Sequence, residues 1–164
     1  MPLQLIPVSW LIGTWRGVGV GGYPTVPEFR FSQEVAFTEL PGKPFLHHLS
    51  RSWLLDDEGG KVRPLATETG FWRVGGAAAE GAGSSVEFLL AHPTGYVEIY
   101  VGTVDGAQIH LATDVVARTE TAKEYSAATR IYGLVAGDLL WAMDMAAVGN
   151  PLTSHASAQL KRVG

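Results

Sequence analysis

Histidine is the residue type that offers the widest range of chemistry in this sequence. There are five histidines and no cysteine, which excludes disulfides, thiolate metal sites, iron–sulfur clusters and cysteine nucleophiles. His47 and His48 are neighbours on a predicted strand, so their side chains point to opposite faces and cannot chelate one ion together. His110 falls on the polar face of another strand. His92 stands in a turn that contains Pro93 and Gly95. We expect its side chain to be exposed to solvent, and the alternative is that it contacts a ligand at the rim of a binding site.

His155 is the fifth histidine, and it opens a short predicted strand after the turn Gly149–Asn150–Pro151. Side chains on a strand alternate between its two faces. The residues on the parity of His155 are polar and those on the opposite parity are apolar: Ser157, Gln159 and Lys161 against Ala156, Ala158 and Leu160. Parity alone therefore favours a solvated face for His155.

The preceding strand carries a row of bulky side chains. Trp141, Met143 and Met145 share one face, opposite Asp144. Such a polarizable wall suits a flat apolar ligand, although ordinary core packing explains it equally well.

A glycine motif near the N-terminus has a second interpretation. Gly17, Gly19 and Gly22 match the G-x-G-x-x-G spacing that brings a pyrophosphate to the start of a helix. Pro24 and Pro27 follow at once, and two prolines so close together do not open a helix. We therefore expect these glycines to bend or bulge a strand at a barrel corner. The spacings of zinc peptidases, α/β-hydrolases and P-loop enzymes are absent from the sequence.

Alternation with a period of two dominates the chain and predicts antiparallel strands. Phe29, Phe31, Val35 and Phe37 fall on one parity of the segment 28–38, and similar alternation recurs at 97–102 and 109–115. Turn signals rich in Gly, Pro and Asp divide the chain into about ten strands with mostly short connections.

These strands predict an all-β fold, an antiparallel up-and-down barrel of about ten strands with room for a ligand inside. The segment Val8–Ile12 is expected to form a short helix that plugs one end. A two-sheet sandwich is the alternative that the same strand spacing permits.

Composition limits the domain organisation and the partners. The 164 residues, 46% of them hydrophobic, fit one domain over 1–164. Twelve basic and 16 acidic side chains give a net charge of -4, which argues against a nucleic-acid partner. No uncharged apolar run approaches the roughly 20 residues of a membrane-spanning helix, and no secretory signal is recognisable. We therefore expect a soluble, cytoplasmic protein without a membrane partner.

The chain resembles the nitrobindin family along essentially its whole length. Gly13, Trp15, Gly17 and Gly19 match the G-x-W-x-G-x-G signature of that family. Further matching elements follow in order, namely Gly22–Tyr23–Pro24–Thr25, Gly42–Lys43–Pro44–Phe45, Glu68–Thr69–Gly70–Phe71–Trp72–Arg73 and Asn150–Pro151–Leu152 with His155.

The resemblance implies a barrel related in shape to fatty-acid-binding proteins and lipocalins, with one haem b per chain near one mouth. By the same resemblance His155 is the axial iron ligand, while Thr25, Lys123 and Met145 lie near the haem. A cation at Lys123 would suit the haem propionates, and a surface lysine on a strand edge is the equally weighted alternative. Some relatives carry a second histidine where this chain has Ala66, so the sixth iron position is expected to be open.

The function that the resemblance implies is isomerisation of peroxynitrite to nitrate on ferric haem, with nitric oxide as a further ligand. The sequence leaves open whether the chain forms a homodimer. One alternative is a carrier of a fatty acid or another hydrophobic ligand, held by an inward arginine. The candidates for that arginine are Arg30, Arg51, Arg73 and Arg130. A haem-based nitric oxide sensor or store without turnover is the other alternative.

Overall fold

Ten antiparallel strands close into one barrel. The computed structural model describes residues 1–77 and 83–164. Each strand pairs with its neighbours in sequence, and β1 pairs with β10 to close the sheet. The strands are β1 (Gly13–Tyr23), β2 (Val26–Glu39), β3 (Phe45–Leu55), β4 (Lys61–Ala77), β5 (Ser84–His92), β6 (Tyr96–Asp105), β7 (Gln108–Arg118), β8 (Tyr125–Val135), β9 (Asp138–Ala147) and β10 (Thr153–Arg162).

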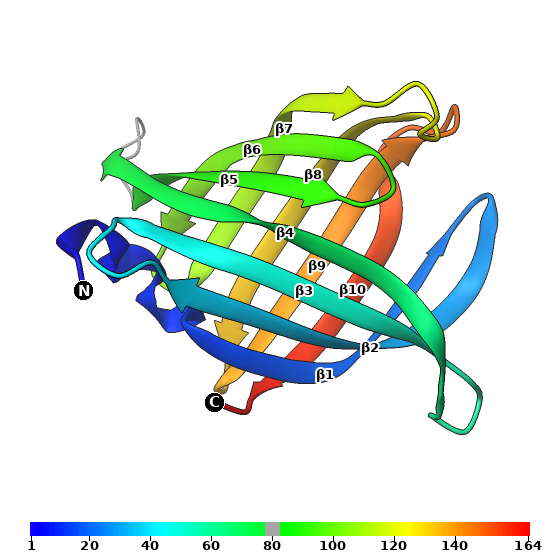
Figure 1. Ribbon diagram of the computed structural model, residues 1–164, viewed down its shortest axis with the longest axis horizontal. Helices are drawn as coiled ribbons and strands as arrows, with labels where there is room; N and C mark the ends of the chain where they lie inside the picture. The colour runs from blue at the N-terminus through cyan, green and yellow to red at the C-terminus, as the bar shows by residue number, and fades with distance from the viewer. Residues whose placement is uncertain (78–82) are drawn as a thin grey trace.

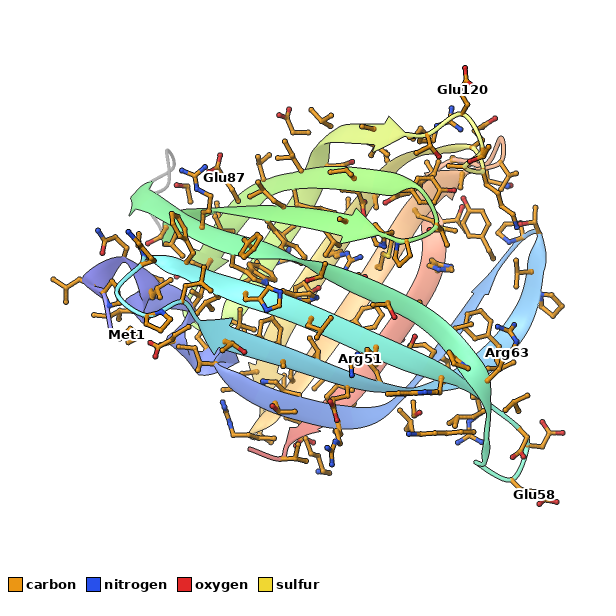
Figure 2. All side chains as sticks on the ribbon, in the orientation of Figure 1. Met1, Arg51, Glu58, Arg63, Glu87 and Glu120 are labelled. Carbon is orange, nitrogen blue, oxygen red and sulfur yellow. The ribbon has the colours of Figure 1, made fainter. Side chains whose placement is uncertain are left out.

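The two ends of the barrel differ. A 3-10 helix, η1 (Leu3–Leu11), lies at one end, on the left in Figure 1. The loops β1–β2, β3–β4, β5–β6, β7–β8 and β9–β10 lie at the opposite end, which we call the mouth. Figure 2 shows Glu58 and Glu120, from two of these loops, at the far side of the molecule from Met1.

The interior is filled with side chains at the η1 end. Leu5, Val8 and Leu11 of η1 are fully buried, so one face of this short helix plugs the barrel. Below it the ring of Trp72 stacks on that of Phe88, with centroids 4.1 Å apart. The barrel interior at this end is therefore a packed core.

The β1 glycines make room for neighbouring groups. A Cβ on Gly19 would lie 2.5 Å from the Phe31 ring, and one on Gly17 would lie 2.9 Å from the Leu160 backbone. Gly17 and Gly19 stand in regular ladders with both neighbouring strands, so the expectation of a bulge is wrong for these two glycines. Only Gly22 lies at a register shift between β1 and β2.

The predicted fold is confirmed in its main features. Ten strands close the barrel, and the short N-terminal helix plugs one end. The sandwich alternative is wrong, because the ladder is continuous around the barrel and leaves no second sheet among residues 1–77 and 83–164. Over the same residues, no helix combines the length and apolar character needed to cross a membrane.

Candidate functional site

The interior opens toward the mouth. On β9, Leu139 is fully buried, whereas Trp141, Met143 and Met145 are only partly buried. On β4, Trp72 is fully buried, whereas Ala66, on the same face, is exposed. We call this space the mouth cavity and define it by the partly or fully exposed inward-facing residues Phe29, Ser52, Ala66, Trp141, Met143 and Met145.

A β-bulge places His155 beside this cavity. In the β9–β10 ladder Ser154 pairs with Asp144 and Ala156 pairs with Met143, so His155 is an extra residue without a partner. A bulge breaks strict alternation. The imidazole therefore leaves the outer face and packs edge-on against the buried Tyr23 ring, with centroids 6.0 Å apart. The prediction from parity that His155 lies on a solvated face is therefore wrong.

One nitrogen of His155 is held and the other is available. Nδ1 lies 3.1 Å from the carbonyl oxygen of Gly22, to which it donates in the Nδ1–H tautomer. Nε2 makes no hydrogen bond to any residue in the described part of the chain. Burial lowers the pKa of His155, and the charge of Arg130 acts in the same direction, against the hydrogen bond to Gly22. The imidazole is thus a neutral donor with a fixed ring orientation, as a metal-ligating histidine requires.

His155 also borders a pocket of about 380 Å³ at the point where β1 and β10 separate. Its lining includes Gly22, Tyr23, Val26 and Ala156. The size falls within the range of roughly 300–1,000 Å³ for small-molecule and cofactor sites. Val20, Glu28 and Ser157, which face outward, also line the pocket, so a ligand can reach the imidazole from the outer side of this seam.

The bulky wall predicted from the sequence is present. Trp141, Met143 and Met145 all face inward and pack against the buried core. The indole of Trp141 is held in place, because its Nε1 donates to Gln33 2.7 Å away and Gln33 in turn donates to Ser50. The wall is therefore an apolar surface on β9, fixed at Trp141, and β9 is the strand next to His155 on β10.

Thr25 and Lys123 lie at the same end of the barrel, on either side of the β9–β10 turn. Thr25 is exposed in the β1–β2 turn, and Lys123 is exposed in the β7–β8 loop. The backbone of that loop is fixed, since the carbonyl of Lys123 accepts hydrogen bonds from Tyr96 and Arg118. No hydrogen bond joins either side chain to His155 in the described part of the chain, and both side chains are exposed at the rim.

A buried ionic network forms the floor of the mouth cavity. Arg130 binds Glu68 through two hydrogen bonds of 2.9 and 3.0 Å. His48 lies 3.0 Å from the same carboxylate through Nε2, and its Nδ1 accepts from Trp72 at 3.2 Å. Because Trp72 can only donate, His48 must be neutral and donate to Glu68. Burial would raise the pKa of Glu68, but Arg130 and His48 outweigh it and hold that pKa well below its usual range.

A second carboxylate extends the network toward the mouth. Glu98 is fully buried and accepts from Tyr100 at 2.7 Å and from Tyr125. His92, at the end of β5, lies 2.5 Å from its other oxygen. Burial opposes ionisation, yet the contact with His92 and the charge of Arg130 lower the pKa of Glu98. Sequence reasoning missed Glu68, Glu98 and His48. Two of them could have been noticed because they are acidic residues on the inward-facing side of a strand. Glu68 lies between Ala66 and Trp72, and Glu98 lies between Tyr96 and Tyr100.

The network predicts that the haem-free barrel loses stability in acid. Burial lowers the pKa of His48 and of His155 from 6.5, so below about pH 6.5 the unfolded chain binds protons that the folded chain does not. The lowered pKa values of Glu68 and Glu98, from 4.5, continue the same trend below about pH 4.5. The midpoint of urea unfolding should fall steadily from about pH 7.5 to about pH 4. A constant midpoint between about pH 7.5 and 5.5 would contradict neutral buried histidines.

The same network uses the arginine that a fatty-acid carrier would need. Arg30, Arg51 and Arg73 are exposed, and Arg130 alone of the four candidates is buried. Its planar fork is already engaged by the two oxygens of Glu68. A fatty acid carboxylate would have to displace a buried partner, which is unfavourable.

The arrangement supplies one neutral imidazole beside a cavity with an apolar wall. Among residues 1–77 and 83–164 no group of three or more His, Cys, Asp or Glu could hold a bare metal ion. A metal held by a single histidine takes its other ligands from outside the protein, and axial histidine ligation of haem, in which a macrocycle supplies them, has this form. The chemistry of the donor set therefore fits a haem.

Comparisons with known proteins agree with this chemistry. Residues 4–162 match the family model described as a THAP4-like, heme-binding beta-barrel domain. A protein of Kineococcus radiotolerans named ferric nitrobindin-like protein is 52% identical, over 99% of this chain and 94% of that protein. A peroxynitrite isomerase of Nocardioides sp. is 49% identical, over 95% of this chain and 91% of that protein. The crystal structure of Rv2717c from M. tuberculosis superposes with a TM-score of 0.84 at 36% identity, covering 100% of this chain and 99% of that one.

Proposed function

The chain belongs to the THAP4-like, haem-binding β-barrel family, and we propose that it holds one haem b through His155 and isomerises peroxynitrite to nitrate. The nitrobindin resemblance seen in the sequence is confirmed by relatives of about 50% identity along the chain. Several of these relatives are named peroxynitrite isomerase. They favour this activity over carriage of a fatty acid.

The observation that carries the proposal is the state of His155. Its Nδ1 is bound to the Gly22 carbonyl, while Nε2 has no protein partner in the described residues. A histidine in an ordinary packed core would have its polar atoms paired inside the protein. Here the residue with the unpaired nitrogen lines a pocket, and its neighbour Ala156 packs in the same cluster as the apolar wall.

The roles of the other residues follow from their positions. Trp141, Met143 and Met145 would pack against the macrocycle and exclude water from one side of it. Lys123 and Thr25, both at the rim, would meet the propionates, the lysine by charge and the threonine by its hydroxyl. Ala66 offers no donor, which supports a sixth iron position open to peroxynitrite and nitric oxide.

When bound, ferric haem supplies the electrophilic iron at which peroxynitrite rearranges to nitrate. The protein contributes little acid–base chemistry to this step. Glu68, the carboxylate nearest to Ala66 on β4, stays ionised and bound by Arg130, so it has no proton to donate. The chain would therefore orient the haem through His155, while the polar groups on the cavity floor stay paired with one another. We place this activity in the cytosol and in a single domain over 1–164.

The test is turnover by the haem-loaded protein. We expect stoichiometric haem binding with a Soret band that shifts when nitric oxide is added. Peroxynitrite should then decay faster than in buffer, and the ratio of nitrate to nitrite should rise. A Soret shift without faster decay would indicate a sensor or store. Failure to bind haem, together with binding of a fatty acid, would support the carrier.

A further inference from the structure

Tyr23 fastens the β1–β2 hairpin to β9 across the intervening strand. Its hydroxyl lies 2.9 Å from the Met145 carbonyl oxygen, to which it donates, and accepts the Ala147 N–H at 2.9 Å. The strand next to β1 on this side is β10, so the Tyr23 side chain passes inside β10 to reach β9. Figure 1 shows this hairpin, in blue, projecting past the other strands at the mouth.

Gly22, next to Tyr23, has no pair of its own in either of the two ladders of β1. The β1–β10 ladder ends at the pair Gly21 and Ala156. The β1–β2 ladder has a register shift between Gly21 and Tyr23, so Gly22 lies in irregular backbone on both sides. The Gly22 carbonyl nevertheless holds Nδ1 of His155. On one side of Gly22, Gly21 is held by its pairs with Ala156 and Phe29, and on the other side Tyr23 is held by its pair with Val26 and by the contacts of its hydroxyl with β9.

We propose that Tyr23 is a positioning residue for His155: by tying the hairpin to β9 it holds the Gly22 carbonyl where it orients the imidazole. The ring of Tyr23 also restricts the orientation of the same imidazole directly, since the two rings meet edge-on with an interplanar angle of 84°. The consequence for a haem rests on the proposed function, in which His155 binds iron. The effect on the imidazole itself does not depend on haem.

The variant that isolates this role is Tyr23→Phe, because it keeps the ring and removes only the hydroxyl. Without the hydroxyl the Ala147 N–H and the Met145 carbonyl lose their partner, and the hairpin separates from β9. The matched control is Tyr132→Phe, which removes a buried hydroxyl that accepts from Arg130 at 3.1 Å, away from His155.

The first measurement uses haem-free protein labelled with ¹⁵N. In wild type, NMR should show a slowly exchanging Nδ1–H for His155 and a single neutral tautomer. Tyr23→Phe should broaden or lose this signal, and Tyr132→Phe should keep it. An unchanged Nδ1–H in Tyr23→Phe would overturn the proposal, whether or not the protein binds haem.

The second measurement uses haem-loaded protein. Tyr23→Phe should transfer haem to an excess of apomyoglobin about 3- to 10-fold faster than wild type, the range expected for one hydrogen bond. The iron–imidazole stretching frequency of the ferrous form should fall or broaden in the same variant. Equal acceleration in Tyr23→Phe and Tyr132→Phe, with unchanged stretching frequencies, would show a general loss of stability and overturn the positioning role. Absence of haem binding by wild type would instead contradict the proposed function. The NMR measurement on haem-free protein would then decide whether Tyr23 positions His155.

Discussion

Replacing His155 by Ala is expected to abolish stoichiometric haem binding while the barrel stays folded. Loss of a residue that only supports a metal ligand lowers metal affinity by about 10- to 100-fold, so loss of the ligand itself should exceed that range. The fold should persist because His155 is a bulge residue without a ladder partner. The measurement is the Soret absorbance during haem titration, with far-ultraviolet circular dichroism to verify the strands.

Two controls make this result specific. His110→Ala removes an exposed histidine from the outer face of β7 and should leave the titration unchanged. Free imidazole should restore part of the Soret band of His155→Ala, because the substitution leaves space where the ring stood. A sharp stoichiometric band in His155→Ala without imidazole would exclude His155 as the axial ligand.

Replacing Arg130 by Met is expected to destabilise the barrel by roughly 3–5 kcal/mol, the range for breaking a buried ion pair. The guanidinium is 4% exposed and binds Glu68 through both oxygens. Its removal leaves the Glu68 charge on the cavity floor without its main partner. For a chain of this size the loss corresponds to a fall in Tm of about 6–20 °C.

The sequence offers a matched surface pair as control. Arg16 and Glu34 also form an arginine–glutamate contact, of 2.5 Å, but the Arg16 side chain is 63% exposed. Arg16→Met should cost less than about 1 kcal/mol. The double variant Arg130→Met with Glu68→Gln should recover part of the lost stability, since it leaves no unpaired charge. Equal effects of Arg130→Met and Arg16→Met would show that the network does not support the barrel.

The strands could be predicted because their alternation is local. Phe31, Val35 and Phe37 are buried on the parity that the pattern indicates, and the Trp141 wall faces inward as expected. The β6 alternation located the strand but not its buried face. Val97 and Val101 are exposed, whereas Glu98 and Tyr100 are fully buried. The buried carboxylate of Glu98 is satisfied by Tyr100 of the same strand and by His92 and Tyr125 of other strands, and the sequence of one strand does not show the latter two.

The orientation of His155 could not be predicted from parity. A bulge adds one residue to one strand, and the register of β10 against β9 is a property of the pair. The family resemblance indicated His155 through ordered motifs, whereas the structure supplies a physical reason in the bulge and the Gly22 carbonyl. The same contact identifies the acceptor for Nδ1, which the sequence alone could not give.

The hydrogen bond between His155 and Gly22 joins residues 133 positions apart and spans the seam between β1 and β10. Contacts of such long range form slowly, because the ends of a long chain must meet first. The oriented imidazole therefore exists only after the barrel has closed. Local opening of this one seam, without global unfolding, is enough to release the imidazole. The residence time of a bound haem would thus depend on how often the seam between β1 and β10 opens. Stabilising the η1 end of the barrel would not prolong that residence time.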